Sequence, residues 1–373
     1  MFMEMPQTQL LSKSQQSTVS RAQCLIDQKE LLKNLCYYQG LLDDKTNVLA
    51  ILKADAYALG LDLILPFLIG QGLKWVGVVT MDEALAVRAL DKTIGILLLS
   101  EPCYDSLYLI CEENISFLVY SLDFLSTIES FPFKEKLRMH LKINTGMNRL
   151  GLTDMNLDAF FEKLDQLDLS LEGVCSHFLG DQLGCKSNEM QFELFSNHIK
   201  KIGTFCNISD LLIHFANTKA VLSIPKSCFN MIRIGLGLYK NSISIQTQIH
   251  RVFKSCKDLL TIGYNATYQI KPNCVIAVAE FGYADGMPTQ LANVGSVLIR
   301  GELYPIVGKV SMDWFMINLG ENHQGIQAGD TVSIISAKHK TLNLESVSKL
   351  SGLNPRELLC HLGPRVERKL IKV

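Results

Sequence analysis

Asn47-Val-Leu-Ala-Ile-Leu52, followed directly by Lys53, is a short apolar run that ends at a charged residue. Seven more such runs follow, separated by segments of helical periodicity. The eight runs are Asn47–Leu52, Trp75–Val79, Ile94–Leu99, Ile115–Tyr120, Met139–Ile143, Leu171–Cys175, Leu211–Phe215 and Met231–Ile234. Met81–Leu90 is one of the helical segments, with Asp82 and Glu83 in its first turn, where the helix dipole favours acidic side chains. Eight strands alternating with helices predict an α/β fold, a TIM-type (β/α)8 barrel.

After about residue 250 the sequence changes to short apolar runs between Gly, Asn and Asp, with little helical periodicity. These runs are Val275–Ala279, Val297–Leu303, Ile306–Val310 and Thr331–Ile335. We therefore expect a barrel over residues 21–245 and a second, mostly β domain over residues 250–373. Arg21–Ile26 also reads as a strand, with Asp27 as the helix cap behind it, and it can belong to either domain. Residues 1–20 are polar and predict a loosely ordered tail.

The composition excludes several classes of protein. With 373 residues, of which 48% are hydrophobic, the chain is long enough for two domains with a large core. Lys and Arg number 36 against 37 Asp and Glu, so no general attraction to nucleic acid or to anionic membranes is expected. Eleven scattered cysteines without a CxxC pair argue against a disulfide framework or a zinc site. No apolar run is long enough to span a bilayer, the N-terminus does not resemble a signal peptide, and the cytoplasm is the expected location.

Polar residues follow several of the predicted barrel strands, at the end where the active sites of such folds form. Lys53 follows the first strand, Arg149 lies just past the fifth, and His177 lies at the end of the sixth. A lysine at the mouth of a barrel strand can bind a carbonyl group covalently if burial lowers its pKa, whereas a lone lysine is more often a solvated surface residue. The uninterrupted apolar strand before Lys53 favours the buried position.

The residues after the seventh and eighth strands suit a phosphate group, which this fold often binds there. Asn217 and Thr218 offer side-chain donors, while Gly235 and Leu236 offer backbone N–H groups. A helix cap explains Asn217 and Thr218 equally well when they are taken alone. Arg233 lies inside an apolar strand, and because an unpaired buried guanidinium is costly, it predicts a fixed acceptor such as a pyridine nitrogen.

Eight blocks of the sequence resemble the signature blocks of the alanine racemase family, in the family's order. The blocks are Ala50-Ile-Leu-Lys-Ala-Asp-Ala-Tyr57, Leu141-Lys-Ile-Asn-Thr-Gly-Met-Asn-Arg-Leu-Gly151, Glu172-Gly-Val-Cys-Ser-His177, Phe215-Ala-Asn-Thr218, Met231-Ile-Arg-Ile-Gly235, Gly263-Tyr-Asn-Ala-Thr-Tyr268, Gly282-Tyr-Ala-Asp-Gly286 and Val307-Gly-Lys-Val-Ser-Met-Asp313. The resemblance implies a pyridoxal-phosphate isomerase that interconverts L-alanine and D-alanine and supplies D-alanine for bacterial peptidoglycan. It also implies the barrel and the C-terminal β domain.

The resemblance assigns roles to individual residues. Lys53 matches the lysine that holds pyridoxal phosphate, and Tyr57 matches a ligand of its phosphate, although a packed aromatic is the safer reading of Tyr57 alone. The other cofactor-binding positions are His177, Asn217, Thr218, Arg233, Gly235 and Leu236. Arg149 matches the residue that binds the substrate carboxylate. Lys142 matches a lysine that is often carbamylated in the family, and its carbamate would hold Arg149 in place.

Racemisation removes a proton from one face of Cα and returns it to the other, so two groups must flank Cα. By resemblance, Lys53 serves one face and Tyr264 serves the other. A phenol is a weak base at neutral pH, and the resemblance implies that His177 and Arg233 make it a better one. An arginine facing the ring nitrogen, in place of an aspartate, leaves that nitrogen unprotonated and makes the cofactor a weaker electron sink, which disfavours transamination.

The two bases lie in different predicted domains, so domain or subunit geometry must bring them together. The family does this between subunits, and we therefore expect a head-to-tail homodimer. The residues that would complete each site from the partner subunit are Tyr264, Tyr283, Met312 and Asp313.

The chain departs from the family pattern near the substrate entrance, without losing a catalytic group. The departures are Ala58-Leu59-Gly60 in place of Gly-His-Gly, Asn265 in place of Gly, Lys309 in place of Arg, and Pro364 where some members have Tyr. Three rival functions stay open. A serine or broad-specificity amino-acid racemase would use the same machinery, a pyridoxal-phosphate decarboxylase would share the domain plan, and a non-catalytic pyridoxal-phosphate-binding protein would need only the barrel.

Overall fold

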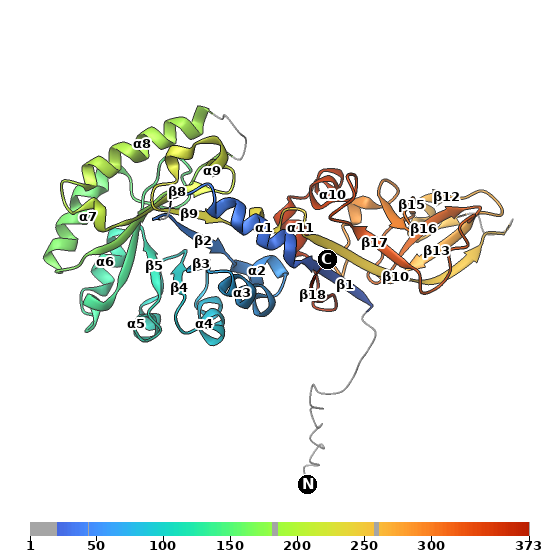
Figure 1. Cartoon of the computed structure of the whole chain (residues 1–373), viewed down its shortest axis with the longest axis horizontal. Helices are drawn as coiled ribbons and strands as arrows, with labels where there is room; N and C mark the ends of the chain where they lie inside the picture. Colours follow the sequence, from blue (N-terminus) through green and yellow to red (C-terminus); the bar gives the residue numbers. More distant parts are fainter. Residues whose placement is uncertain (1–20, 44, 181–185, 257–260, 373) are drawn as a thin grey trace, which may run out of the picture.

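The computed structural model describes residues 21–43, 45–180, 186–256 and 261–372, and the predicted polar tail at residues 1–20 lies outside them. A barrel forms one end of the molecule and a β domain forms the other, and the long strand β10 (Ile243–Lys254) runs from the middle of the molecule into the β domain (Figure 1). Among the described residues, no helix is long and apolar enough to cross a membrane.

Eight parallel strands close into a barrel in sequence order, because β2 pairs with both β3 and β9. The strands are β2 (Asn47–Ile51), β3 (Trp75–Val78), β4 (Gly95–Leu98), β5 (Ser116–Val119), β6 (Arg138–Lys142), β7 (Leu171–Cys175), β8 (Leu212–Asn217) and β9 (Met231–Ile234). The predicted (β/α)8 fold is confirmed, and each strand ends within two residues of its predicted limits. Leu49, Leu97 and Met231 pack together with other apolar side chains in a cluster separate from the main core.

Helices cover the outside of the barrel (Figure 1). They are α1 (Gln28–Gln39), α3 (Leu61–Gly70), α4 (Met81–Leu90), α5 (Leu107–Glu112), α6 (Leu122–Ile128), α7 (Asp154–Gln166), α8 (Lys186–Ile202) and α9 (Ala220–Ser223), whereas the short segment α2 (Lys53–Ala58) lies at the carboxyl end of β2. The predicted helix α4 begins with a capping box between Thr80 and Glu83. Asp27 caps α1, as its position before the helical segment predicts.

The C-terminal domain is built on an eight-stranded sheet. Across the sheet, the strands are β13 (Val275–Ala279), β16 (Phe315–Gly320), β15 (Glu302–Val307), β14 (Ser296–Ile299), β17 (Thr331–Ile335), β10, β1 (Ala22–Asp27) and β18 (Glu367–Ile371). Strand β10 also pairs with β13, so the sheet curls back on itself. Strand β1 lies between β10 and β18, which places the N-terminal strand in this sheet. The ribbon β11 (Thr261–Ile262) and β12 (Tyr268–Gln269) and the helices α10 (Leu344–Ser351) and α11 (Pro355–Cys360) complete the domain.

The prediction of one strand over Val297–Leu303 is wrong, because the chain turns inside that run. Strand β14 ends at Ile299 and β15 begins at Glu302, and the two pair as an antiparallel hairpin. Arg300 and Gly301 form the turn with φ values of 48° and 86°. Positive φ at both central residues is typical of the two-residue turns that match the twist of paired strands.

Candidate active site

A cavity of about 450 Å³ opens at the carboxyl ends of the barrel strands. Ten of the residues that the sequence singles out line it, namely Lys53, Tyr57, Lys142, Arg149, His177, Asn217, Thr218, Arg233, Gly235 and Leu236. These residues come from different strands of the barrel: Lys53 directly follows β2, Lys142 ends β6, and Gly235 directly follows β9. The barrel therefore brings together every residue predicted to bind the cofactor.

The four remaining predicted residues lie in the C-terminal domain, away from this cavity. Tyr264 is 70% exposed and lines a separate cavity of about 560 Å³, which shares no described lining residue with the first. Tyr283 and Met312 are also exposed and lie close together, since the backbone N–H groups of Tyr283 and Ala284 donate to the carbonyls of Ser311 and Met312. The carboxylate of Asp313 accepts a hydrogen bond from Arg365 at 2.7 Å.

Lys53 begins α2, and the five residues after it have a left-handed backbone. Their φ values lie between 53° and 63° over residues 54–58, and none of the five is glycine. An L-residue in this region costs about 1–2 kcal/mol. Contacts from outside the turn must therefore hold it, and in doing so they fix Lys53 and Tyr57 relative to each other.

Two such contacts come from distant parts of the chain. The carboxylate of Glu83 accepts a hydrogen bond from the backbone N–H of Ala54 at 2.6 Å. The guanidinium of Arg368, in β18, donates to the backbone carbonyl of Ala58 at 2.9 Å. The C-terminal domain therefore helps to position the lysine of its own barrel.

The lining of the cavity is basic. Among the described residues it contains no Asp or Glu, and its cations are Lys53, Lys142, Arg149, Lys219, Arg233 and Arg356. The prediction that Lys53 is buried is wrong, because its side chain is exposed at the cavity mouth, where the chain has turned out of β2; partial desolvation there, followed by the charge of Arg149, still lowers its pKa. Burial also lowers the pKa of Lys142, with further lowering by Arg233 and Arg149. Both amines release a proton more readily than a free lysine, and the cavity as a whole favours an anionic ligand.

The buried guanidinium of Arg233 is tied to the barrel by both of its terminal nitrogens. Nη1 donates to the carbonyl and to Nδ1 of His214, at 2.7 and 2.8 Å. Nη2 donates to the carbonyl of Ser176 at 2.6 Å and to Nδ1 of His177 at 3.0 Å. Within the described parts of the chain, no carboxylate contacts Arg233 and its Nε–H has no acceptor. That N–H is available to a ligand in the cavity.

Both histidines beside Arg233 are neutral at pH 7. Burial, followed by the charge of Arg233, holds the pKa of His177 and of His214 well below the usual value. A neutral imidazole whose Nδ1 accepts a hydrogen bond carries its proton on Nε2. His177 therefore offers the cavity an N–H donor and not a positive charge.

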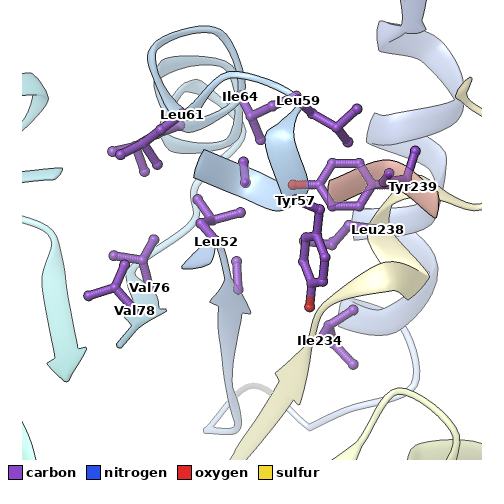
Figure 2. Close-up of a cluster of buried hydrophobic side chains, with 14 of the residues drawn as sticks. Leu52, Tyr57, Leu59, Leu61, Ile64, Val76, Val78, Ile234, Leu238 and Tyr239 are labelled. Atoms are coloured by element: carbon purple, nitrogen blue, oxygen red, sulfur yellow. The ribbon is translucent and has the colours of Figure 1, made fainter. Parts of the chain in front are cut away.

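Tyr57 lies on the inner side of the left-handed turn, and only 5% of its surface is exposed to solvent. Its ring packs edge-on against Tyr239, and its hydroxyl points away from that ring toward the end of β9 (Figure 2). A Cβ atom on Gly235 would lie only 2.2 Å from the Tyr57 hydroxyl oxygen, so only glycine allows this approach. Burial raises the pKa of Tyr57 to about 12, which keeps the hydroxyl protonated as a donor.

Asn217 caps a helix, which is one of the two explanations that the sequence leaves open. Its Oδ1 accepts hydrogen bonds from the backbone N–H groups of Lys219 and Ala220, both at 3.1 Å. The cap uses only the oxygen, so the amide nitrogen remains a donor for a ligand. Next to it, Thr218 Oγ1 accepts a hydrogen bond from the backbone N–H of Gly235 at 3.4 Å.

Two residues of the site were not predicted. His214 is a polar residue inside the largely apolar strand β8, which is the same sequence signal that predicts a functional role for Arg233. Arg356, at the start of α11, lines the cavity, and its charge opposes the rise in the pKa of Tyr57. The sequence around Arg356 gives no sign of this role, because α11 reaches the barrel only through the docking of the C-terminal domain.

The residues present fit pyridoxal phosphate. The amine of Lys53 suits the carbonyl group, and the unshared Nε–H of Arg233 suits the ring nitrogen. The phosphate would lie among Tyr57, Arg356 and the backbone beside Gly235, where a Cβ atom would fill the space.

Comparison with known proteins gives a consistent result over residues 26–370. Residues 26–242 match the family model of the alanine racemase N-terminal domain, and residues 242–370 match that of the alanine racemase C-terminal domain. "Alanine racemase 2" of Caldanaerobacter subterraneus subsp. tengcongensis is 28% identical over 358 residues, which covers 91% of this chain and 92% of the relative. "Alanine racemase" of Treponema denticola is 29% identical over 355 residues, covering 88% and 93%.

Among solved structures, the alanine racemase from Bartonella henselae with covalently bound pyridoxal phosphate superimposes with a TM-score of 0.85 at 24% identity. That likeness covers 94% of this chain and 100% of the other. Because both domains match in order and the first alone covers more than half of the residues, the chain belongs to the alanine racemase family.

Proposed function

We propose that this protein interconverts L-alanine and D-alanine with pyridoxal phosphate, using Lys53 and Tyr264 as its two acid/base groups. The observation that carries the proposal is the barrel cavity, in which the Lys53 amine and the Arg233 guanidinium line one basic space. When bound there, pyridoxal phosphate withdraws electrons from the Cα–H bond of the amino acid and makes that proton removable.

Lys53 moves the proton on one face of Cα. Its lowered pKa leaves more of the amine unprotonated at neutral pH, as a base requires. The left-handed turn fixes the backbone from which the amine extends. Arg149, on the same lining, binds the substrate carboxylate through its two-pronged guanidinium and so orients Cα toward the amine.

Arg233 and His177 act on the second base. Because Nδ1 of His177 accepts from Arg233, its Nε2–H is free to donate to a phenol oxygen. A donated hydrogen bond stabilises the phenolate form and makes the phenol a better base. In our proposal that phenol is Tyr264 of the partner subunit.

The position of Tyr264 supports a homodimer. Tyr264 opens the short turn η6 (Tyr264–Ala266), which directly precedes β12, and β12 lies at the end of the molecule far from the barrel (Figure 1). The 70% exposure of its side chain supports our proposal that Tyr264 enters the cavity of a second subunit. Tyr283, Met312 and Asp313 would approach the same partner cavity.

Lys142 is suited to carbamate formation. Its ammonium group first loses one proton to solvent, and the neutral nitrogen then attacks the carbon of carbon dioxide. A C–N bond forms as one C=O π bond opens, and a second proton leaves to solvent. The product replaces a cation with an anion beside Arg149 and Arg233, which removes a like-charge contact and gives Arg149 a fixed partner.

A complementation experiment tests the shared site. Lys53→Ala and Tyr264→Phe should each abolish racemisation of L-alanine, followed as loss of optical rotation. Mixed in equal amounts and allowed to exchange subunits, the two variants should recover about a quarter of the wild-type activity. Half of the dimers are then mixed, and each mixed dimer contains one intact site of two. Full activity of Tyr264→Phe alone, or no recovery on mixing, would contradict the proposal.

The substrate range is tested on the wild-type protein. Turnover of L-alanine well above that of L-serine and L-lysine is expected, and comparable turnover of all three would indicate a broad-specificity racemase instead. Release of carbon dioxide from any of them would indicate a decarboxylase. We also propose the cytoplasm as the site of action, in keeping with the unpaired cysteines in the described parts of the chain.

A further inference from the structure

A chain of buried polar side chains runs through the barrel behind Arg233, and the proposed mechanism does not use it. His214 Nε2 and His140 Nδ1 are 2.9 Å apart, and His140 Nε2 lies 3.1 Å from Oε2 of Glu172. Both imidazoles are fully buried, at 0% exposed. With the contact from Arg233 to His214, these bonds connect the guanidinium in the cavity to a carboxylate through two histidines.

The two ends of this chain fix the direction of every hydrogen bond in it. A guanidinium can only donate and an ionised carboxylate can only accept. His214 must therefore accept at Nδ1 and donate from Nε2 to His140 Nδ1. His140 must in turn donate from Nε2 to Glu172, so both imidazoles are neutral with the proton on Nε2. The opposite arrangement would aim an N–H of His214 at an N–H of Arg233.

Glu172 is ionised and firmly placed. Burial alone would raise its pKa, but hydrogen bonds from His140 and Ser116, with Arg138 nearby, hold its pKa at about 2. Ser116 Oγ and Arg138 Nη2 both donate to the carboxylate. Ser116 begins β5 and Arg138 begins β6, so the carboxylate lies at the amino ends of the strands, opposite the cavity.

Gly173 leaves space in the barrel for this chain of hydrogen-bonded side chains. A Cβ atom on Gly173, the neighbour of Glu172 in β7, would lie 2.5 Å from Nδ1 of His140 and 2.5 Å from the carbonyl oxygen of Leu212. No larger residue fits beside the imidazole without moving it. The local sequence therefore accommodates the imidazole pair at a specific place in the core.

We propose that Glu172 is a positioning residue for Arg233: as the acceptor at the far end, it sets the tautomers of His140 and His214 and thereby the place of the guanidinium. The inference rests on the proposed function, since it assigns Arg233 to the cofactor. Without an acceptor at position 172, the Nε2–H of His140 is buried and unsatisfied. Reversing the pair removes that buried donor, but only if Arg233 moves away from the N–H that His214 then presents to it.

The test compares two variants that change the same carboxylate contact. Glu172→Leu removes the acceptor of the chain, whereas Ser116→Ala removes another hydrogen bond to the same oxygen and leaves the chain intact. Nitrogen NMR of histidine-labelled, full-length protein loaded with pyridoxal phosphate reports which ring nitrogen carries the proton. We expect Nε2–H on both His140 and His214 in the wild type and in Ser116→Ala, and Nδ1–H on His214 in Glu172→Leu.

The cofactor and the kinetics give a second readout. Glu172→Leu should weaken pyridoxal phosphate binding about tenfold and lower kcat about tenfold, with little change in KM because Arg149 lies outside the chain. Glu172→Gln should restore most of both, since its carbonyl oxygen can still accept from His140 while the exposed Arg138 turns to water.

Three outcomes would overturn the inference: Nδ1–H on either histidine in the folded wild type, unchanged tautomers and affinity in Glu172→Leu, or equal losses in Ser116→Ala and Glu172→Leu. The wild-type measurement stands even if Glu172→Leu fails to fold. If the predicted tautomers are found in a protein that racemises no amino acid, the proposed function fails and the positioning chain stands.

Discussion

Replacing Ala54 with glycine should stabilise the protein, although glycine normally weakens helical segments. Ala54 has φ 53° and ψ 52°, and it is exposed, so no packing is lost with its methyl group. An L-residue in this left-handed region costs about 1–2 kcal/mol, which glycine avoids. The greater freedom of glycine in the unfolded chain offsets about 0.4–1 kcal/mol of that gain. We therefore expect the free energy of unfolding to rise by about 0.5–1 kcal/mol.

The matched control is Ala86→Gly, an exposed alanine inside the right-handed helix α4. There glycine should lower the free energy of unfolding by about 1 kcal/mol. Urea unfolding of the full-length variants, followed by circular dichroism, gives both free energies from the midpoint and the slope. The two substitutions should have opposite signs. If Ala54→Gly lowered the free energy of unfolding as much as Ala86→Gly does, residue 54 would not have a left-handed backbone. The description of the turn after Lys53 would then be wrong.

Other predictions concern the cavity. Gly235→Ala should displace the Tyr57 hydroxyl and weaken pyridoxal phosphate binding by at least about tenfold in an absorbance titration, whereas Gly70→Ala, which meets only open space, should leave it unchanged. Arg356→Gln should weaken the same binding about tenfold; because Arg356 also lowers the pKa of Lys53, the acid limb of the activity profile should move to higher pH. With isotope-labelled carbon dioxide, a carbamate resonance should grow as the pH rises through the lowered pKa of Lys142, since only the neutral amine reacts, and Lys142→Arg should lack it. Equal affinity of Gly235→Ala and Gly70→Ala for pyridoxal phosphate would contradict the first prediction. An unchanged pH profile in Arg356→Gln would contradict the second, and a carbamate resonance that persists in Lys142→Arg would contradict the third.

The barrel could be predicted from the sequence because most of its strands are short, largely apolar runs separated by segments of helical periodicity. Periodicity therefore locates β2 through β9 to within two residues. Periodicity does not locate the hairpin of β14 and β15. Its turn has only two residues, so Val297–Leu303 has the pattern of a single strand. The turn is marked only by Arg300, Gly301 and Glu302, and the apolar residues Val297–Ile299 and Leu303–Tyr304 continue on both sides of it.

The left-handed turn after Lys53 could not be predicted. Ala-Asp-Ala-Tyr-Ala contains no glycine, and alanine favours the right-handed helix more than any other residue. The local preference is overridden by contacts with Glu83 and Arg368, which come from 29 residues and 310 residues away in the chain. Tertiary contacts of that range leave no pattern in the five residues that they constrain. Arg356 escaped prediction for the same reason.

The contact between Arg368 and Ala58 also bears on how Tyr264 can reach the chemistry. A hinge that carried Tyr264 to the Lys53 of its own chain would have to swing the C-terminal domain, and β18 and α11 with it, away from the barrel. That motion would break the bond from Arg368 to the Ala58 carbonyl and withdraw Arg356 from the cavity, so the turn that positions Lys53 would lose a support as Tyr264 arrived. In the proposed dimer, a second copy of the chain would supply the phenol without disturbing either contact. The geometry therefore favours an active site shared between two subunits over one formed by closure of the two domains of a single chain.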